Sequence, residues 1–179
     1  RYRRLGALMK SELLKIAEAI VNRAVDGEQV EVVTVHGTET DIRVYQGEIE
    51  SFTAAESQGV GIRVVQDGRQ GMAYAGSLDP DVLNETLEEA RDNASFGTPD
   101  EFQGIAEPDG VESVSLKLLD SSLADFANEE KIAMAIELER SILDSDSRII
   151  GVESTDYVDS ITTSAIVTST GIHRANQEG

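Results

Sequence analysis

The 179-residue sequence contains no cysteine and no tryptophan, and it has only two histidines, three prolines, four tyrosines and four phenylalanines. Without cysteine, disulfide bonds, thiolate metal ligands and cysteine nucleophiles are excluded. The absence of disulfides fits a reducing compartment, so we expect a cytoplasmic location. Hydrophobic residues still make up 40% of the chain. A packed core is therefore possible, and it must be built mainly from Ile, Val, Leu and Ala.

Basic residues are also scarce, because 15 lysines and arginines stand against 34 aspartates and glutamates, for a formal net charge of −19. Such a surface repels the phosphates of nucleic acid and of anionic membranes. No run of residues approaches the roughly 20 apolar positions that span a bilayer. The sequence therefore predicts no direct contact with nucleic acid and no membrane association.

The first ten residues, 1–10, have a basic start but only a very short apolar stretch. A secretory signal peptide needs a longer apolar region followed by a cleavage site with small residues. We set residues 1–10 apart from the first domain and interpret residues 1–8 as a leader or as residues added before the natural start, with Met9 a plausible first residue.

Residues 11–96 predict an N-terminal α+β domain. Apolar residues at three- and four-residue steps predict a helix over 11–25, and a second helix begins at Asp79-Pro80. Between the helices, short runs rich in β-branched residues predict strands at 29–36, 41–45, 49–56, 60–66 and 70–75. Turns are expected between them at Gly37-Thr38, Gln46-Gly47, Gln58-Gly59 and Asp67-Gly68, the last being the strongest hairpin signal. Tight turns make neighbouring strands antiparallel, so the domain is an antiparallel β-meander flanked by helices.

Residues 97–115 contain prolines, glycines and acidic residues, and we interpret them as a linker. Residues 116–179 predict the beginning of a second α+β unit, a partial central domain. It has a helix over 129–144 capped by Asn128, strands at 148–157 and 161–169, and a turn at Ser169-Thr170-Gly171. Gly179 arrives before any third strand, and a two-stranded hairpin is marginal alone. We therefore expect the sequence to be a fragment of a longer protein.

Few side chains form a recognisable catalytic, metal-binding or phosphate-binding arrangement. A zinc site usually needs three or four ligands, whereas the only histidines, His36 and His173, lie in different predicted units. We interpret His36 as a strand-end residue and His173 as a tail residue. Gly59-Val60-Gly61 does not precede a helix and so cannot hold phosphate, and Ser169 has no histidine nearby in any known motif.

Another possible function is that of a self-contained hydrolase that uses carboxylates. The candidate residues are Asp144, Asp146, Asp156 and Asp159. General acid and base catalysis needs two carboxyl groups at a defined separation with shifted pKa values. In a chain with 34 acidic residues, neighbouring carboxylates are expected by chance. A different class of function is peptide binding, because a free edge of an antiparallel sheet can accept an extended peptide as an added strand. The acidic character would favour unfolded or basic peptides.

The order of several short motifs resembles the TldD/PmbA family, over residues 11–172. The N-terminal motifs are Gly47-Glu48-Ile49-Glu50-Ser51, Gly59-Val60-Gly61-Ile62-Arg63-Val64 and Asp67-Gly68-Arg69-Gln70-Gly71-Met72-Ala73. Residues 129–133, 137–140 and 148–153 and Ser169-Thr170-Gly171-Ile172 resemble the start of the family's central domain. The residues there are more similar to those of the PmbA (TldE) branch than to those of the TldD branch.

The resemblance implies a two-subunit cytoplasmic assembly linked to intracellular proteolysis. TldD-like members carry a zinc site of the form His-Glu-x-x-x-His, whereas PmbA-like members generally lack it and act as the partner subunit. This sequence has no such motif, so no zinc ligand is carried over. The family has also been associated with peptide-antibiotic maturation, antitoxin turnover and modulation of DNA gyrase.

These observations predict a non-catalytic N-terminal region of a PmbA/TldE-like subunit of an intracellular metallopeptidase. It would be a scaffold for oligomer assembly and peptide access, with no catalytic or metal-binding residues and with binding residues unknown. Its expected partners are a TldD-like subunit or a second copy, and a peptide or unfolded protein. The segment itself is expected to hold no cofactor, and zinc is expected only in a TldD-like partner. The alternative is a stand-alone peptide- or protein-binding module without a role in catalysis.

Overall fold

The computed structural model describes residues 2–112, 114 and 116–179, without the side chains of residues 2–8. Arg1 of the predicted leader, and residues 113 and 115 of the predicted linker, lie outside the described part. The chain forms two compact units. Unit 1 comprises the chain up to His36, Ser57–Lys117 and Thr162–Glu178, and unit 2 comprises Gly37–Glu56, Leu118–Ile161 and Gly179.

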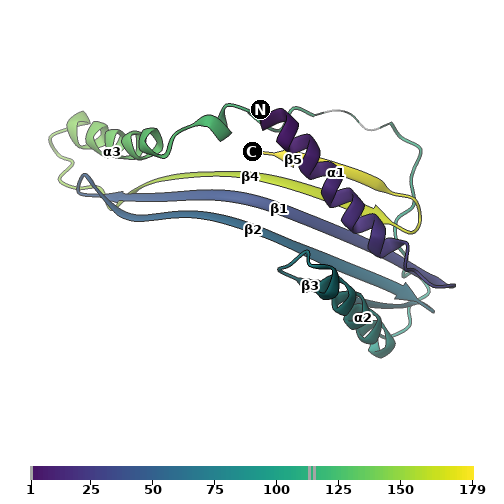
Figure 1. Ribbon diagram of the computed structural model, residues 1–179. Coiled ribbons are helices and arrows are strands. Elements are labelled where there is room, and N and C mark those ends of the chain that lie inside the picture. Colours follow the sequence, from purple (N-terminus) through teal and green to yellow (C-terminus); the bar gives the residue numbers. More distant parts are fainter. Residues whose placement is uncertain (1, 113, 115) are drawn as a thin grey trace. The chain divides into compact units, whose positions relative to one another are not determined.

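The helices and strands define an α+β fold with an antiparallel sheet, as predicted (Figure 1). The strands have the order β3-β2-β1-β4-β5 in the sheet. The elements in chain order are α1 (Tyr2–Val21), β1 (Glu28–Tyr45), β2 (Glu48–Gln66), β3 (Arg69–Ala75), α2 (Pro80–Phe96), a 3₁₀ turn (Leu123–Asp125), α3 (Asn128–Ser145), β4 (Thr155–Thr168) and β5 (His173–Glu178).

The strands are longer than the sequence predicts, and two predicted turns are wrong. Gly37-Thr38 lies inside β1 and Gln58-Gly59 lies inside β2, so each strand replaces two predicted ones. Glycine is favoured in tight hairpin turns because it accepts a positive φ, and Gly59 does not take one. The turns at Gln46-Gly47 and Asp67-Gly68 are confirmed, with φ of 54° and 77° in the first and 51° and 69° in the second.

The helix ends show which sequence signals are reliable. Asp79 caps α2 as predicted, since its Oδ1 accepts a hydrogen bond from Asp81 N at 3.0 Å. Asn128 is wrong as the cap of α3, because it is the first helical residue and Ala127 is the N-cap. Glu130 Oε2 accepts from Ala127 N at 3.3 Å, so a side chain from inside the helix satisfies the terminal N–H.

The first and last parts of the chain also differ from prediction. Helix α1 begins at Tyr2 and ends at Val21, so residues 2–10 are helical. The two strands predicted at 148–157 and 161–169 are replaced by one strand, β4, which begins only at Thr155, so residues 148–154 are not in a strand. A further strand, β5, pairs with β4 from Thr162↔Glu178 to Val167↔His173. Strands β1, β2 and β4 contribute residues to both compact units, which therefore do not follow sequence order. The predicted boundaries 11–96, 97–115 and 116–179 stay predictions.

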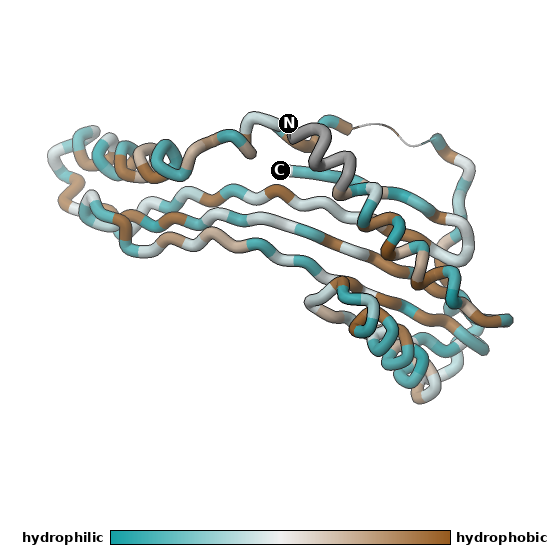
Figure 2. The backbone as a smooth tube through the Cα atoms, in the orientation of Figure 1, coloured by the Kyte–Doolittle hydropathy of each residue, from teal (hydrophilic) through white to brown (hydrophobic). Residues whose placement is uncertain are grey.

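Unit 1 has a conventional apolar core between its two helices and one face of the sheet. Alternate residues of β1 and β2, including Val30, Val32, Ile62 and Val64, pack against α1 and α2, and Figure 2 shows hydrophobic residues concentrated there. The buried stripe of α2 is Leu83, Thr86, Leu87, Ala90 and Ala94, as predicted except that Val82 is only half-buried.

Helix α2 lies very close to β3 at Gly71. A Cβ atom at this position would lie inside the contact distance of Ala94 N and Ala90 O, two backbone atoms that cannot rotate away. The outer edge of β3 is also occupied by this helix. Asn93 Nδ2 donates to Met72 O at 2.9 Å, and Gly97 lies against Gln70. The β3 edge is therefore largely closed to an added strand by the protein itself.

Candidate functional site

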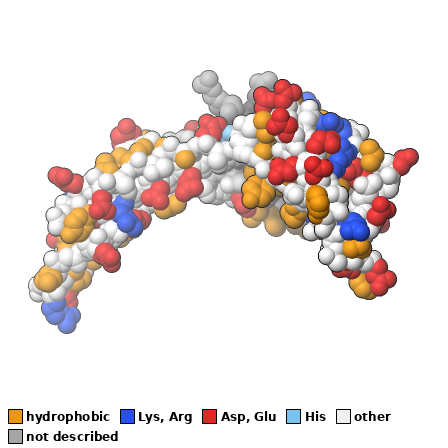
Figure 3. All heavy atoms as spheres, turned by 90° about the horizontal axis from the view of Figure 1, so that it is seen from below, with side chains coloured by type: hydrophobic (Ala, Val, Ile, Leu, Met, Phe, Trp, Pro, Cys, Tyr) orange, Lys and Arg blue, Asp and Glu red, His pale blue; other side chains and the backbone are white. Residues whose placement is uncertain are grey.

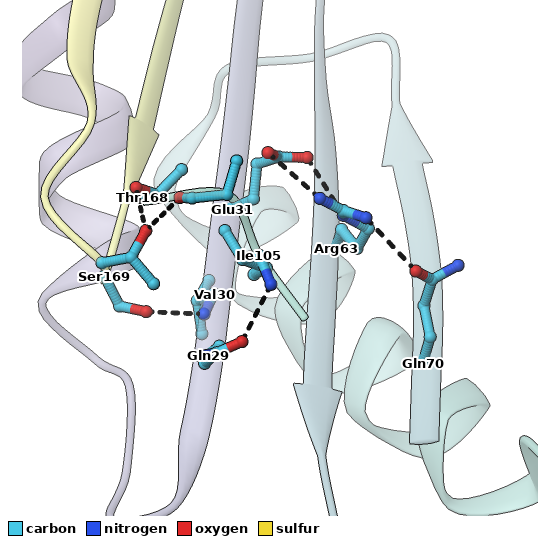
Figure 4. Close-up of polar contacts among 10 residues, drawn as sticks. Gln29, Val30, Glu31, Arg63, Gln70, Ile105, Thr168 and Ser169 are labelled. Carbon is cyan, nitrogen blue, oxygen red and sulfur yellow. Dashed lines mark hydrogen bonds and ion pairs between the residues drawn. The ribbon is translucent and has the colours of Figure 1, made fainter. Parts of the chain in front are cut away.

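The opposite face of the unit 1 sheet carries a polar network (Figure 4). Arg63 Nε lies 3.1 Å from Glu31 Oε1, and Arg63 Nη1 donates to Gln70 Oε1 at 3.3 Å, so the network crosses three strands. Nearby, Ile105 N donates to Gln29 Oε1 at 2.9 Å and ties the segment after α2 to β1. Each group satisfies its neighbour, so this network supports the sheet rather than offering a reactive group.

Ser169 follows β4 and also has a structural position, beside the backbone of β1. Its backbone N donates to Val30 O at 2.8 Å, and its Oγ accepts from Val30 N at 2.9 Å. Gly59 and Gly61 lie in a strand. Neither feature is arranged for nucleophilic chemistry or for phosphate binding.

A second cluster of polar groups lies in unit 2, where α3 packs on the sheet. The small apolar core there is Ile42, Val44 and Ala135. The buried residues of α3 are Lys131, Ala135 and Glu139, which recur at four-residue steps and share one helix face. Two of these three residues carry a charge, which is uncommon for buried positions.

Lys131 is the centre of this cluster. Its Nζ lies 2.7 Å from Asp159 Oδ2 and 3.1 Å from Thr40 Oγ1, and it lies 5.8 Å from the centre of the Tyr157 ring. Tyr157 Oη donates to Asp159 Oδ2 at 2.7 Å. Thr40, Tyr157 and Asp159 come from β1 and β4, and Lys131 comes from α3. The four side chains therefore join a helix to two strands within unit 2.

The protonation of the cluster follows from these contacts. Burial alone would raise the pKa of Asp159, but the hydrogen bonds from Lys131 and Tyr157 outweigh it and lower the pKa below the ordinary value. Burial, together with the hydrogen bond to Asp159, raises the pKa of Tyr157 to about 12. At neutral pH the carboxylate is ionised and the phenol is protonated. Neither group is prepared to act as a nucleophile or as a general acid for a substrate.

A hollow of about 730 Å³ opens beside this cluster in unit 2. Leu123, Phe126, Met134 and Val158 give it apolar walls, Asp120 and Ser122 lie on its polar side, and Tyr157 and Asp159 connect it to Lys131. The rings of Phe126 and Tyr157 lie 6.2 Å apart at a tilt of 57°. The hollow is largely apolar, and one of its two lining aspartates, Asp159, is paired with Lys131.

Glu139 is the second buried charge of α3. Its carboxylate accepts hydrogen bonds from Gln46 N at 2.8 Å and from Gly47 N at 2.6 Å. These are the two residues of the β1–β2 turn, where both backbones have positive φ. The carboxylate therefore satisfies N–H groups at the turn and holds it against α3.

The other carboxylates considered for hydrolysis do not converge. Asp156 Oδ1 accepts from Arg43 Nε at 2.8 Å, and Asp146 is paired with Arg148. In both aspartates the hydrogen bond from the arginine lowers the pKa. Asp156 and Asp159 are three residues apart on β4 and point to opposite faces of the sheet. Asp144 lies at the end of α3. This arrangement gives no support to the carboxylate-hydrolase hypothesis.

The histidines are placed differently from the prediction, because His36 and His173 belong to the same compact unit. His36 lies in β1 and His173 begins β5, and β4 runs between these strands. Among the residues that the structure describes, no three His, Asp or Glu side chains gather closely enough to hold a metal ion. The described residues therefore offer no ligand set of the kind that TldD-like members use for zinc.

Sequence reasoning missed Lys131, Tyr157 and Thr40. Only two weak signals for these residues were present in the sequence. Lys131 lies at four-residue spacing with Ala135 and Glu139 on α3, and Tyr157 and Asp159 are alternate residues of one strand. The surface agrees with the composition, since Figure 3 shows acidic side chains spread over the visible face with few basic ones between them. None of the described helices has the length and apolar character needed to cross a bilayer.

The fold and this site define a class: an α+β chain in which paired buried charges join a helix to the strands of a sheet. Comparison with known families then identifies the chain. Residues 30–94 match the model described as PmbA/TldA metallopeptidase domain 1, and residues 121–177 match the PmbA/TldA metallopeptidase central domain. The chain belongs to the PmbA/TldD family, which confirms the resemblance.

Similarity to curated proteins supports the same family assignment. The chain is 28% identical over 152 residues to metalloprotease PmbA of Escherichia coli O157:H7, and 25% identical over 152 residues to a metalloprotease PmbA homolog of Haemophilus influenzae. Each match covers 80% of this chain and 33% of the relative. The chain therefore spans about a third of the length of these curated relatives.

Solved structures show the same fold. A modulator of DNA gyrase, as its name describes it, from Bacteroides thetaiotaomicron has a TM-score of 0.80 at 22% identity, over 91% of this chain and 38% of that one. A similarly named protein from Thermotoga maritima gives 0.74 at 22% identity, over 94% and 36%. TldE from Thermococcus kodakarensis gives 0.68 at 20% identity, over 94% and 36%.

Proposed function

We propose that this chain is the non-catalytic N-terminal region of a PmbA/TldE-like subunit in a TldD/TldE-type cytoplasmic metallopeptidase. It acts as a scaffold on which a TldD-like subunit or a second copy assembles and along which a peptide or unfolded protein gains access. Zinc belongs to the TldD-like subunit in this proposal, because the residues described here do not gather a ligand set.

The observation that carries the proposal is the order of the family matches. The first domain and the central domain of a metallopeptidase family follow one another along this chain, at residues 30–94 and 121–177. The contacts of the site support a structural role, since Lys131 neutralises Asp159 and Arg43 neutralises Asp156. In this proposal the catalytic chemistry is supplied elsewhere in the assembly.

The test is co-purification of the complete gene product with a TldD-like subunit from the same organism. Native mass spectrometry should show a complex containing both chains. Zinc should be found only when the TldD-like subunit is present, and cleavage of an unfolded peptide should require both. If the two chains do not associate and the gene product leaves peptide cleavage unchanged, the proposal is wrong.

A further inference from the structure

The sequence contains three Asp-Gly pairs, Asp26-Gly27, Asp67-Gly68 and Asp109-Gly110. Such a pair can rearrange chemically, because glycine has no side chain to shield its backbone nitrogen from the carboxyl group of the aspartate before it. Attack of the nitrogen on this carboxyl group closes a five-membered succinimide ring. Water then opens the ring to aspartate or to isoaspartate. The three pairs are alike in sequence, but the structure holds them differently.

The Asp67-Gly68 pair is held on all sides. Ring closure requires rotation of the aspartate backbone, so that the glycine nitrogen reaches the side-chain Cγ. Here the rotation would break the strand pairing at Gln66↔Arg69 and the hydrogen bond from Asp100 N to Gly68 O, at 2.8 Å. The Cβ position of Gly68 also lies 2.9 Å from Asp100 O, so the turn has little room to move. Each bond that must open lowers the population of the reactive conformation.

The Asp26-Gly27 pair is exposed, but the residues on both sides of it are fixed. Glu28 N donates to Val25 O at 3.0 Å, and Val25 N donates to Glu28 Oε2 at 3.1 Å. The carboxylate of Glu28 is buried and lies 2.8 Å from Arg91 Nε. Rotation at Asp26 would therefore disturb a buried charge and its partner, which is costly.

The chain before the third pair is attached to unit 1 at two points. Residues 103–112 belong to no helix or strand. Ala106 O accepts a hydrogen bond from Thr170 Oγ1 at 2.6 Å, and Pro108 Cγ lies 3.5 Å from the Cβ position of Gly171. The loop is therefore anchored up to Pro108.

Beyond Pro108 the Asp109-Gly110 pair is exposed. No atom lies within 4 Å of the Cβ position of Gly110. In the described part of the chain, the contact that rotation would break is the hydrogen bond from Val111 N to Asp109 Oδ1, at 2.9 Å. This bond turns the carboxyl group back over the backbone that follows it. The pair thus combines a nearby carboxyl group with few contacts to open.

We propose that Asp109 is the residue at which the folded chain forms isoaspartate. Gly110 N bonds to Asp109 Cγ, and the nitrogen proton and the carboxyl OH leave as water. When water then attacks the main-chain carbonyl carbon of Asp109, the bond from that carbon to Gly110 N breaks. The main chain now runs through Cγ, and the former main-chain carbonyl is a free carboxylate. A carboxyl methyltransferase that recognises isoaspartate is the class of enzyme that would act on this group.

The experiment uses the full 179-residue chain, incubated at physiological temperature and sampled over several weeks. Trypsin cuts after lysine and arginine and so places the three pairs in three different peptides. Isoaspartate in each peptide is measured by methylation with an isoaspartate methyltransferase and labelled S-adenosylmethionine. The folded chain should contain at least about tenfold more isoaspartate at Asp109 than at Asp26 or Asp67. In denaturant the three sites should become alike, because no contact then holds any of them.

Two matched variants separate structure from sequence. In D109N and D67N the leaving group is ammonia, so the same ring forms faster and mass spectrometry detects the change from amide to acid. The folded D109N chain should react at least about tenfold faster than the folded D67N chain, and the two should react alike in denaturant. D109E lengthens the side chain by one methylene and should remove the isoaspartate from its peptide.

Three results would overturn the proposal. One is an equal amount of isoaspartate at the three sites of the folded chain. Another is a larger amount at Asp26 or Asp67 than at Asp109. The third is its absence at Asp109 in the folded chain over a period in which the denatured chain forms it.

Discussion

The two compact units are stabilised in different ways. Unit 1 buries a continuous set of aliphatic residues between α1, α2 and the sheet, and among its charged residues it buries Glu28, which is paired with the partly exposed Arg91. Unit 2 buries only Ile42, Val44 and Ala135 as apolar residues and adds Lys131 and Glu139 from the same helix face. In unit 1 the packing depends on shape, and in unit 2 it depends on charge.

The two units therefore differ in what fixes the packing of their helices against the sheet. Apolar burial contributes about 25 cal/mol per Å², but a close-packed apolar core leaves little room for a side chain of another volume or shape. A buried charge is stable only when its partner is in place, and losing the partner costs several kcal/mol. Unit 2 should therefore tolerate changes of shape better than changes of charge, and unit 1 should show the reverse.

The largest effect is expected for Gly71→Ala in unit 1. The added methyl group would meet the backbone of α2 at Ala90 and Ala94, and the helix would have to move away from β3. We expect a loss of about 3 kcal/mol or more in the free energy of unfolding, measured with chemical denaturant. Gly61→Ala is the matched control, because no atom lies within 4 Å of its Cβ position. Equal losses in the two variants would show that close packing at Gly71 is not the cause.

In unit 2, Lys131→Met should come next. The substitution keeps the length of the side chain but leaves the Asp159 carboxylate without its cation, at a cost of about 2–4 kcal/mol. Lys15→Met on the exposed face of α1 should change stability by less than about 0.5 kcal/mol. The double variant K131M/D159N should regain part of the loss. If it is as unstable as the two single losses added together, the two side chains are not coupled.

A smaller effect is expected for Glu139→Gln. The neutral amide has one oxygen where the carboxylate has two, so one of the N–H groups of Gln46 and Gly47 loses its acceptor. We expect a loss of about 1–2 kcal/mol and faster hydrogen exchange at these two amides. Glu137→Gln, on the exposed side of the same helix, should leave the exchange of both amides unchanged.

The smallest effect is expected at alkaline pH, where Tyr157 should lower the stability of unit 2. The pKa of Tyr157 is about 12 in the folded chain, against an ordinary value of 10.0, so the folded state holds the phenol proton more tightly. Its stabilisation is complete below about pH 10 and is lost as the pH rises towards 12. Tyr157→Phe should cost about 1 kcal/mol at neutral pH and remove this dependence. Tyr74→Phe, in unit 1, should keep it, as measured by denaturation at a series of pH values.

Local signals in the sequence were sufficient for much of unit 1. Asp79 before Pro80 marks the start of α2, and Asp67-Gly68 marks a turn, because capping and positive φ depend on neighbouring residues alone. The same reasoning failed at Gly37 and Gly59. A glycine in a strand and a glycine in a turn look alike in the sequence, and sheet pairing decides between them.

The polar cluster of unit 2 could not be predicted in the same way. Lys131 and Asp159 are 28 positions apart in the sequence, and Glu139 and Gln46 are 93 apart. Whether a lysine on a helix is buried depends on which strand lies opposite, and one chain gives no local sign of that.

The carboxylate of Glu139 has a practical consequence for inserting tags. Hairpin turns are usually chosen for insertions because they are exposed and poorly packed, but here an extra residue at Gln46-Gly47 would move both N–H groups off their acceptor. The Asp67-Gly68 turn is no better, since Gly68 O accepts from Asp100 N at 2.8 Å. Gly110, with a positive φ and no atom within 4 Å of its Cβ position, is the better place for a label or an epitope.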